Sequence, residues 1–114
     1  MTLGTVSVHF ATEEAAETLR ADEALRVREI APGASKDELL SAIAEALDLP
    51  EYFGHNWDAL QECLQDLELD DRVLVLLVEH GSMLWQEIPR EMSNLVDTWL
   101  ASVGDRDLHL VFVW

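Results

Sequence analysis

The chain has 114 residues, of which 49% are hydrophobic and 26% charged, so it can form one globular domain with a buried core. Its 23 Asp and Glu residues outnumber its 7 Lys and Arg residues, which gives a formal net charge of −16. Phosphate backbones and anionic membrane surfaces repel such a chain, which argues against nucleic acid and lipid as partners. A basic protein, a cation or water alone remains compatible with this charge.

The cysteine and hydropathy patterns indicate where the protein resides. Cys63 is the one cysteine, which rules out an internal disulfide and fits a reducing compartment. No early segment combines the basic and apolar regions of a signal peptide, and the longest apolar run, Val73–Val78, is far shorter than the roughly 20 residues that span a bilayer. We therefore expect a cytoplasmic protein.

Residues 1–24 have the pattern of an N-terminal strand and helix. Apolar and polar residues alternate over 6–10, as in a half-buried strand, and Thr12 is a suitable helix N-cap. The helix that follows Thr12 carries few large apolar side chains, so it has little to bury. We interpret this segment as an extension whose removal leaves the domain of residues 25–114 folded.

Three elements in the first part of this domain have clear signals. Leu25, Val27 and Ile30 predict a short strand over 25–30. Ser35 and Glu38 have the spacing of a capping box, which predicts a helix over 36–47. Residues 73–78 are continuously apolar, which is typical of a central strand covered on both faces.

The C-terminal part continues the alternation of strands and helices. A short turn or helix is expected at 83–85, and a longer helix begins at Pro89 and ends near Gly104. Alternating residues over 108–114 predict the last strand. The order of elements predicts an α/β fold with a small parallel sheet packed against helices: three core strands and a possible extra edge strand at the N-terminus.

The helix that begins after Asn56 is strongly acidic on one side. Its apolar residues form one narrow face, and the acids lie opposite that face at i, i+4 and i+8: Asp58, Glu62 and Asp66. Between Lys36 and Arg72 the chain has eleven Asp or Glu and no Lys or Arg. Like charges at this spacing repel by a few tenths of a kcal/mol per pair, and nothing on the helix offsets this cost.

Two interpretations of these acids remain open. The first is a solvated face of an acidic protein. The second is a negatively charged docking surface for a cationic cleft, because aromatic and amide groups of the kind found in interfaces directly precede the acids. These preceding residues are Tyr52, Phe53, Gly54, His55 and Asn56.

Catalytic and metal chemistry have weaker signals. Asp58 and Glu62 have the separation of paired catalytic carboxylates, but so do any two acids at i, i+4, and this helix face is convex. The acids near Asp70 lack the spacing of a calcium loop, and the histidines show no metal-ligand spacing with Cys63. We expect no enzymatic activity, no metal and no cofactor.

The segment Leu49–Leu64, with the sequence LPEYFGHNWDALQECL, closely resembles the barstar family of intracellular ribonuclease inhibitors. The shared pattern is a Pro, an aromatic pair, Gly-x-Asn, a large apolar residue and Asp-Ala-Leu, followed by an acid and a small residue before Leu. The resemblance extends more loosely over residues 25–114. It implies a small α/β domain whose loop and helix plug the active site of a basic, secreted, guanyl-type ribonuclease in a 1:1 complex.

The resemblance also implies roles for individual residues. Asp58 and Glu62 would face the cations of the ribonuclease, and the loop residues Tyr52, Phe53, Gly54, His55 and Asn56 would supply further contacts. The chain departs from barstar at Gln61 and Glu62, where barstar has Trp and Asp, and near Leu100, where barstar has a contact acid. These departures keep the inhibitor class but argue against barnase itself as the target. The alternative is an acidic interaction or immunity module with a partner that is not a ribonuclease.

Overall fold

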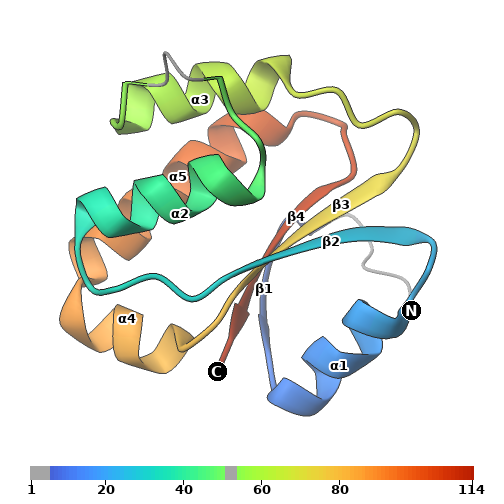
Figure 1. Cartoon of the computed structure of the whole chain (residues 1–114), viewed down its shortest axis with the longest axis horizontal. Coiled ribbons are helices and arrows are strands. Elements are labelled where there is room, and N and C mark those ends of the chain that lie inside the picture. The colour runs from blue at the N-terminus through green and yellow to red at the C-terminus, as the bar shows by residue number, and fades with distance from the viewer. Residues whose placement is uncertain (1–5, 51–53) are drawn as a thin grey trace.

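The computed structural model describes residues 6–50 and 54–114, and its strands form one parallel sheet (Figure 1). The strand order across the sheet is β1-β4-β3-β2, and every pair of neighbours is parallel. The predicted small parallel sheet with an extra N-terminal edge strand is therefore confirmed. The strands are β1 (Val8–Ala11), β2 (Leu25–Ile30), β3 (Val73–Val78) and β4 (Leu108–Val113).

The helices begin where the capping residues predict. The Ser35 hydroxyl accepts a hydrogen bond from the Glu38 amide at 3.1 Å, and the Thr12 hydroxyl accepts one from the Ala15 amide at 3.1 Å. The segment around Met83 forms a short helix. The helices are α1 (Glu13–Ala21), α2 (Lys36–Ala46), α3 (Trp57–Asp66), α4 (Gly81–Glu87) and α5 (Pro89–Val103).

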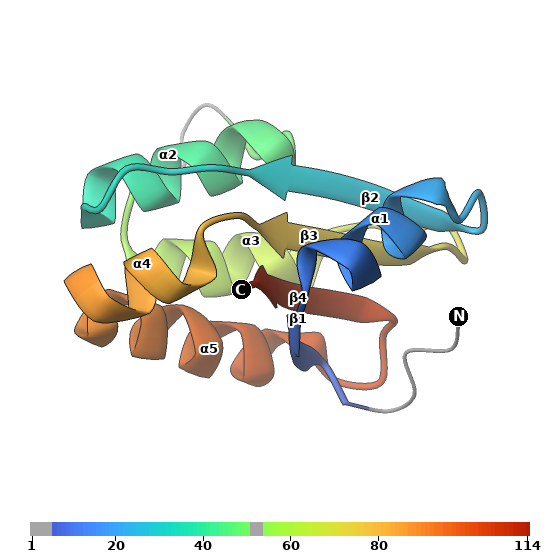
Figure 2. The same cartoon turned by 90° about the horizontal axis from the view of Figure 1, so that it is seen from below.

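One face of the sheet is covered by α2, α3, α4 and α5 (Figures 1 and 2). The main core lies between this face and the four helices. Trp99 of α5 is fully buried there, and its indole nitrogen donates to the Leu108 carbonyl at 3.2 Å. Strand β3 lies between β2 and β4, as its continuous apolar sequence predicts. The side chains that fill this core include Leu39, Ile43, Leu60, Leu64, Leu76, Leu84, Met92, Leu95 and Phe112.

The opposite face of the sheet is covered by α1 (Figure 1). Ala16 and Leu19 of this helix are buried in a second cluster with Val75, Leu77, Val111 and Val113. Only these two residues of α1 are buried, as its few large apolar side chains predict, but the sequence did not reveal that the helix covers an apolar face of the sheet. Ala16 is small, so its burial against the sheet is easily overlooked in the sequence.

Ion pairs also hold α1 in place. Arg20 near its C-terminal end forms hydrogen-bonded ion pairs with Glu13 in the same helix, with Glu29 of β2 and with Glu79 directly after β3. These contacts connect α1 to the carboxyl ends of two strands. Within residues 6–50 and 54–114, no helix is long and apolar enough to cross a membrane.

Candidate partner-binding surface

The N-terminal end of α3 is organised by Asn56. Its side-chain oxygen accepts a hydrogen bond from the Ala59 amide at 2.8 Å, which caps the helix as the sequence predicts. Its side-chain nitrogen donates to the Gly54 carbonyl at 3.2 Å. A Cβ atom at Gly54 would lie only 3.2 Å from that same nitrogen, so a glycine suits this turn. Asn56 thus connects the end of the loop to the start of the helix.

His55 connects the same loop to α2. Its backbone has φ of +48°, in the left-handed region that few residues other than glycine and asparagine adopt readily. Its Nδ1 atom lies 3.4 Å from the Ser41 hydroxyl oxygen of α2. These contacts hold residues 54–56, the end of the loop before α3, against α2 and α3.

The structure places most of the predicted site residues on one surface. Gly54, His55, Asn56, Asp58 and Glu62 are exposed, and Gln61 is partly buried beside them. Tyr52 and Phe53 lie outside the described residues.

The acids of α3 form a continuous exposed row along the helix. Asp58, Glu62 and Asp66 are all exposed, whereas Leu60 and Leu64 on the other side of the helix are fully buried. None of the ion pairs found within residues 6–50 and 54–114 involves these three acids. We refer to Asp58, Glu62 and Asp66 as the acidic row.

Trp57 and Glu91 join the N-terminal end of α3 to α5. The indole nitrogen of Trp57 donates to Oε2 of Glu91 at 3.1 Å, and Glu91 lies in the first turn of α5. The helical spacing of Trp57, Leu60 and Leu64 places Trp57 on the narrow apolar face of α3, but it does not identify the partner of the indole. The only local signal is that a tryptophan on a partly exposed stripe generally needs an acceptor for its N–H group.

Arg106 joins the C-terminal end of α3 to α5. Its guanidinium donates to the carbonyls of Leu64 and Leu67 at 2.6 and 2.9 Å, and to the Ser102 carbonyl at 2.8 Å. These are terminal carbonyls of two helices that have no basic residue in their own last turns. The two ends of α3 are therefore both bonded to groups in or next to α5, and this holds the acidic row in one orientation.

Cys63 lies among the packed side chains of α3. The thiol is partly buried, and its burial raises its pKa, as do the charges of Asp66 and Glu62. A raised pKa keeps the thiol protonated and poorly nucleophilic at neutral pH. This environment is that of a packing residue.

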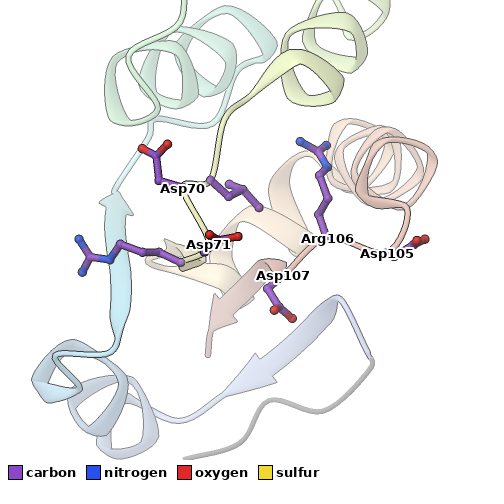
Figure 3. A pocket seen from close by; sticks show the side chains of 7 residues that line it. Asp70, Asp71, Asp105, Arg106 and Asp107 are labelled. Atoms are coloured by element: carbon purple, nitrogen blue, oxygen red, sulfur yellow. The ribbon is translucent and has the colours of Figure 1, made fainter.

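A surface hollow of about 390 Å³ lies at the other end of the molecule, where the loops before β3 and β4 meet (Figure 3). Four aspartates line it, but Figure 3 shows their side chains pointing in different directions and Arg106 pointing toward the helices. Among the described residues, no group of three or more His, Cys, Asp or Glu is arranged to hold a metal ion. The hollow therefore lacks the convergent groups of a catalytic site.

The sequence also matches a known protein family. Residues 24–110 match the family model described as Barstar (barnase inhibitor), which covers more than half of the chain. The chain belongs to the barstar family. No curated protein matches the chain.

The barstar match includes β2, the helices α2 to α5 and the first part of β4. It contains the acidic row together with Trp57, Glu91 and Arg106. Strand β1 and helix α1 precede the match, which begins at Ala24. The division into an extension of residues 1–24 and a barstar-like domain of residues 25–114 stays a prediction, because β1 and α1 belong to the same sheet and its packing.

Proposed function

We propose that this protein binds the basic active-site cleft of a secreted microbial ribonuclease, of the guanyl-specific type, and blocks it in a 1:1 complex. The acidic row carries the proposal, because it is an exposed set of carboxylates, without an ion pair among the described residues, in the segment that matches the barstar family. A cleft that binds the phosphates of RNA is cationic, and carboxylates can take the places of those phosphates. The protein would act in the cytoplasm and protect the cell that produces the ribonuclease.

Within this proposal, the loop and the first two turns of α3 form the centre of the interface. Asp58 and Glu62 would pair with cations of the ribonuclease. Gly54, His55 and Asn56 would pack against the rim of the cleft, together with Tyr52 and Phe53. Gln61, partly buried on the side next to the acids, would fill space where barstar has the larger Trp.

The bonds at both ends of α3 support the same function. An inhibitor gains affinity when its contact residues are already held in the bound arrangement, because less conformational entropy is lost on binding. The bonds from Trp57 to Glu91 and from Arg106 to Leu64 and Leu67 restrain α3 in this way. The free protein tolerates the repulsion within the acidic row because these bonds and the buried face hold the helix.

The proposal is tested by mixing the purified full-length protein with a panel of small, basic, secreted microbial ribonucleases and measuring RNA cleavage. Loss of activity at one equivalent of protein supports the proposal. No inhibition of any member of the panel, combined with binding to a basic protein that is not a ribonuclease, would support the alternative of an interaction or immunity module. Saturable turnover of a substrate by the protein alone would contradict both.

A further inference from the structure

Two histidines from neighbouring strands meet on the face of the sheet that α1 covers. His9 lies on the edge strand β1, and His109 lies on β4. The Nε2 atom of His9 is 3.0 Å from the Nδ1 atom of His109, and the two ring centroids are 5.2 Å apart. His109 is only 4% exposed. The pair therefore forms a partly buried hydrogen bond between the two strands.

This hydrogen bond depends on the number of protons that the pair holds. One ring nitrogen must donate and the other must accept, so at least one of the two imidazoles must be neutral. When both rings are protonated, every ring nitrogen carries a hydrogen, and the bond is replaced by repulsion between two positive charges. Burial lowers the pKa of both histidines, and the proximity of His9 lowers that of His109 further.

Two groups partly offset this effect: hydrogen bonding to the backbone of Val6 raises the pKa of both histidines, and the charge of Asp107 raises the pKa of His109. The Asp107 carboxylate lies 4.0 Å from Nε2 of His109 and favours its charged form, but this carboxylate is largely exposed. The neighbouring strands present apolar residues on this face, Val75 and Val111. Arg20, which fixes α1 to the sheet, forms ion pairs with the carboxylates of Glu13, Glu29 and Glu79.

Strand β1 is a short edge strand; its Val8 packs against the main core and its Ala11 against the second cluster. It has four residues, none of which is fully buried, and it pairs with β4 alone. On the other face of the sheet, Phe10 contacts the rings of Phe112, Trp85 and Trp114 but remains 59% exposed. A backbone hydrogen bond to β4 or the residue after it lies at each end of the strand. The Leu110 amide donates to the Ser7 carbonyl at 2.8 Å, and the Trp114 amide donates to the Ala11 carbonyl at 2.7 Å.

We propose that the His9–His109 pair is a pH-sensitive clasp that holds edge strand β1 on β4 at neutral pH and releases it in acid. The ion pairs that fix α1, from Arg20 to Glu13, Glu29 and Glu79, involve neither histidine. Release is therefore local: β1 detaches while α1 stays fixed to the ends of β2 and β3. The device acts outside the acidic row and does not depend on the proposed function.

The direction of the effect follows from the lowered pKa values. Both histidines bind protons more weakly in the closed strand than in the open one, where the pKa returns to about 6.5. The closed state is thus fully favoured above pH 6.5 and loses its advantage as the pH falls below it. For each proton taken up on opening, the equilibrium constant for opening changes by at most about tenfold per pH unit. Two protons therefore change it by at most about a hundredfold per pH unit.

Hydrogen exchange of the full-length protein, followed by NMR between pH 7.5 and 5 and corrected for intrinsic exchange, tests the clasp. The amides of Leu110 and Trp114 report on β1, and the Glu79 amide, which bonds to the Ile30 carbonyl between β2 and β3, is the internal reference. We expect the two β1 reporters to lose at least about tenfold protection relative to Glu79 on acidification. Equal pH dependence of all three amides would overturn the proposal.

Variants separate the histidine pair from general acid effects. His9→Gln combined with His109→Gln removes both titrating groups, and we expect the pH dependence of the β1 reporters to disappear. His80→Asn is the matched control, because His80 is exposed and Asn accepts its left-handed backbone, with φ of +59°. The control should keep the wild-type pH dependence; if the double variant keeps it too, the clasp is wrong.

A measurement on the wild-type protein covers the case in which the double variant does not fold. The imidazole signals of His9 and His109 can be followed directly by NMR as the pH is lowered. Titration of both rings at or above pH 6.5 would contradict the clasp. Titration below that value, together with loss of the Leu110 protection over the same pH interval, would support it.

Discussion

The Arg106 guanidinium donates a 2.9 Å hydrogen bond to the carbonyl of Leu67, the residue that ends α3. A charged donor at the carboxyl end of a helix satisfies free carbonyls and interacts favourably with the helix dipole. Helix α3 carries only acids as charged residues, so this cation must come from elsewhere in the chain. Arg106 supplies it from the loop before β4.

Replacement of Arg106 should therefore destabilise the protein. Arg106→Ala leaves the carbonyls of Leu64, Leu67 and Ser102 without this donor, which should cost about 2–3 kcal/mol in the free energy of unfolding. Arg106→Lys should cost less, because an ammonium group can reach part of the set. Urea denaturation measures both, and Arg90→Ala at an exposed position is the control, expected within about 0.5 kcal/mol of wild type. A loss as small as that of the control would refute this role.

The Trp57–Glu91 bond can be tested by a double-mutant cycle. Trp57→Phe removes the donor, Glu91→Ala removes the acceptor, and the double variant removes both. We expect a coupling energy of roughly 1–2 kcal/mol in unfolding, because the acceptor is charged and the bond is partly buried. Glu91→Gln keeps an acceptor oxygen and should retain part of the coupling. A coupling energy near zero would mean that the bond does not fix α3.

The two interpretations of the acidic row predict the same effect on stability but different effects on binding. Glu62→Gln relieves repulsion with both neighbours, so the unfolding free energy should rise by a few tenths of a kcal/mol in either case. If the row is an interface, Glu62→Gln and Asp58→Asn should each weaken ribonuclease binding by roughly 2–5 kcal/mol, the range for buried charge pairs at interfaces such as that of barnase and barstar.

Asp66→Asn is the internal control for this series, since Asp66 is exposed and lies two turns away from Asp58. It should affect binding far less than the other two changes. Melting temperature and inhibition constant are measured for all three variants. Small and equal effects on inhibition at the three positions would leave the acidic row as a solvated face.

The net charge of −16 predicts that association with a basic ribonuclease is steered. The on-rate should fall markedly as ionic strength rises, whereas the off-rate should change less because the contacts at the centre of an interface are poorly screened. Steering raises on-rates by roughly 10- to 1000-fold, a range for which the barnase–barstar complex is itself a reference case. Stopped-flow measurements at several salt concentrations test this, and an on-rate independent of salt would argue against the acidic surface.

Deletion of residues 1–24 should destabilise the protein strongly. Sequence patterns alone led us to expect a folded remainder, but α1 covers Val75, Leu77 and Val111, each of which has no exposed surface. Exposure of such side chains costs roughly 1.5–3 kcal/mol for each one fully uncovered. Circular dichroism and urea denaturation of the truncated chain decide the matter; cooperative unfolding with wild-type stability would show that the sheet does not need this cover.

Local sequence signals determined much of the framework. Asn56 and Ser35 cap helices within three residues of themselves, and the six apolar residues of β3 require cover on both faces. These interactions act over a few residues, so they can be recognised in the sequence. The acidic row was predicted for the same reason, because a helix repeats its faces every three to four residues.

Only the tertiary structure decided which distant groups meet. Trp57 and Glu91 are 34 residues apart, Arg106 and Leu67 are 39 apart, and His9 and His109 are 100 apart. No propensity or spacing predicts such pairs, because they form when burial of apolar surface brings whole elements together. The role of α1 is decided in the same way. Its own buried face is small, and it contributes to stability by covering the apolar face of the sheet.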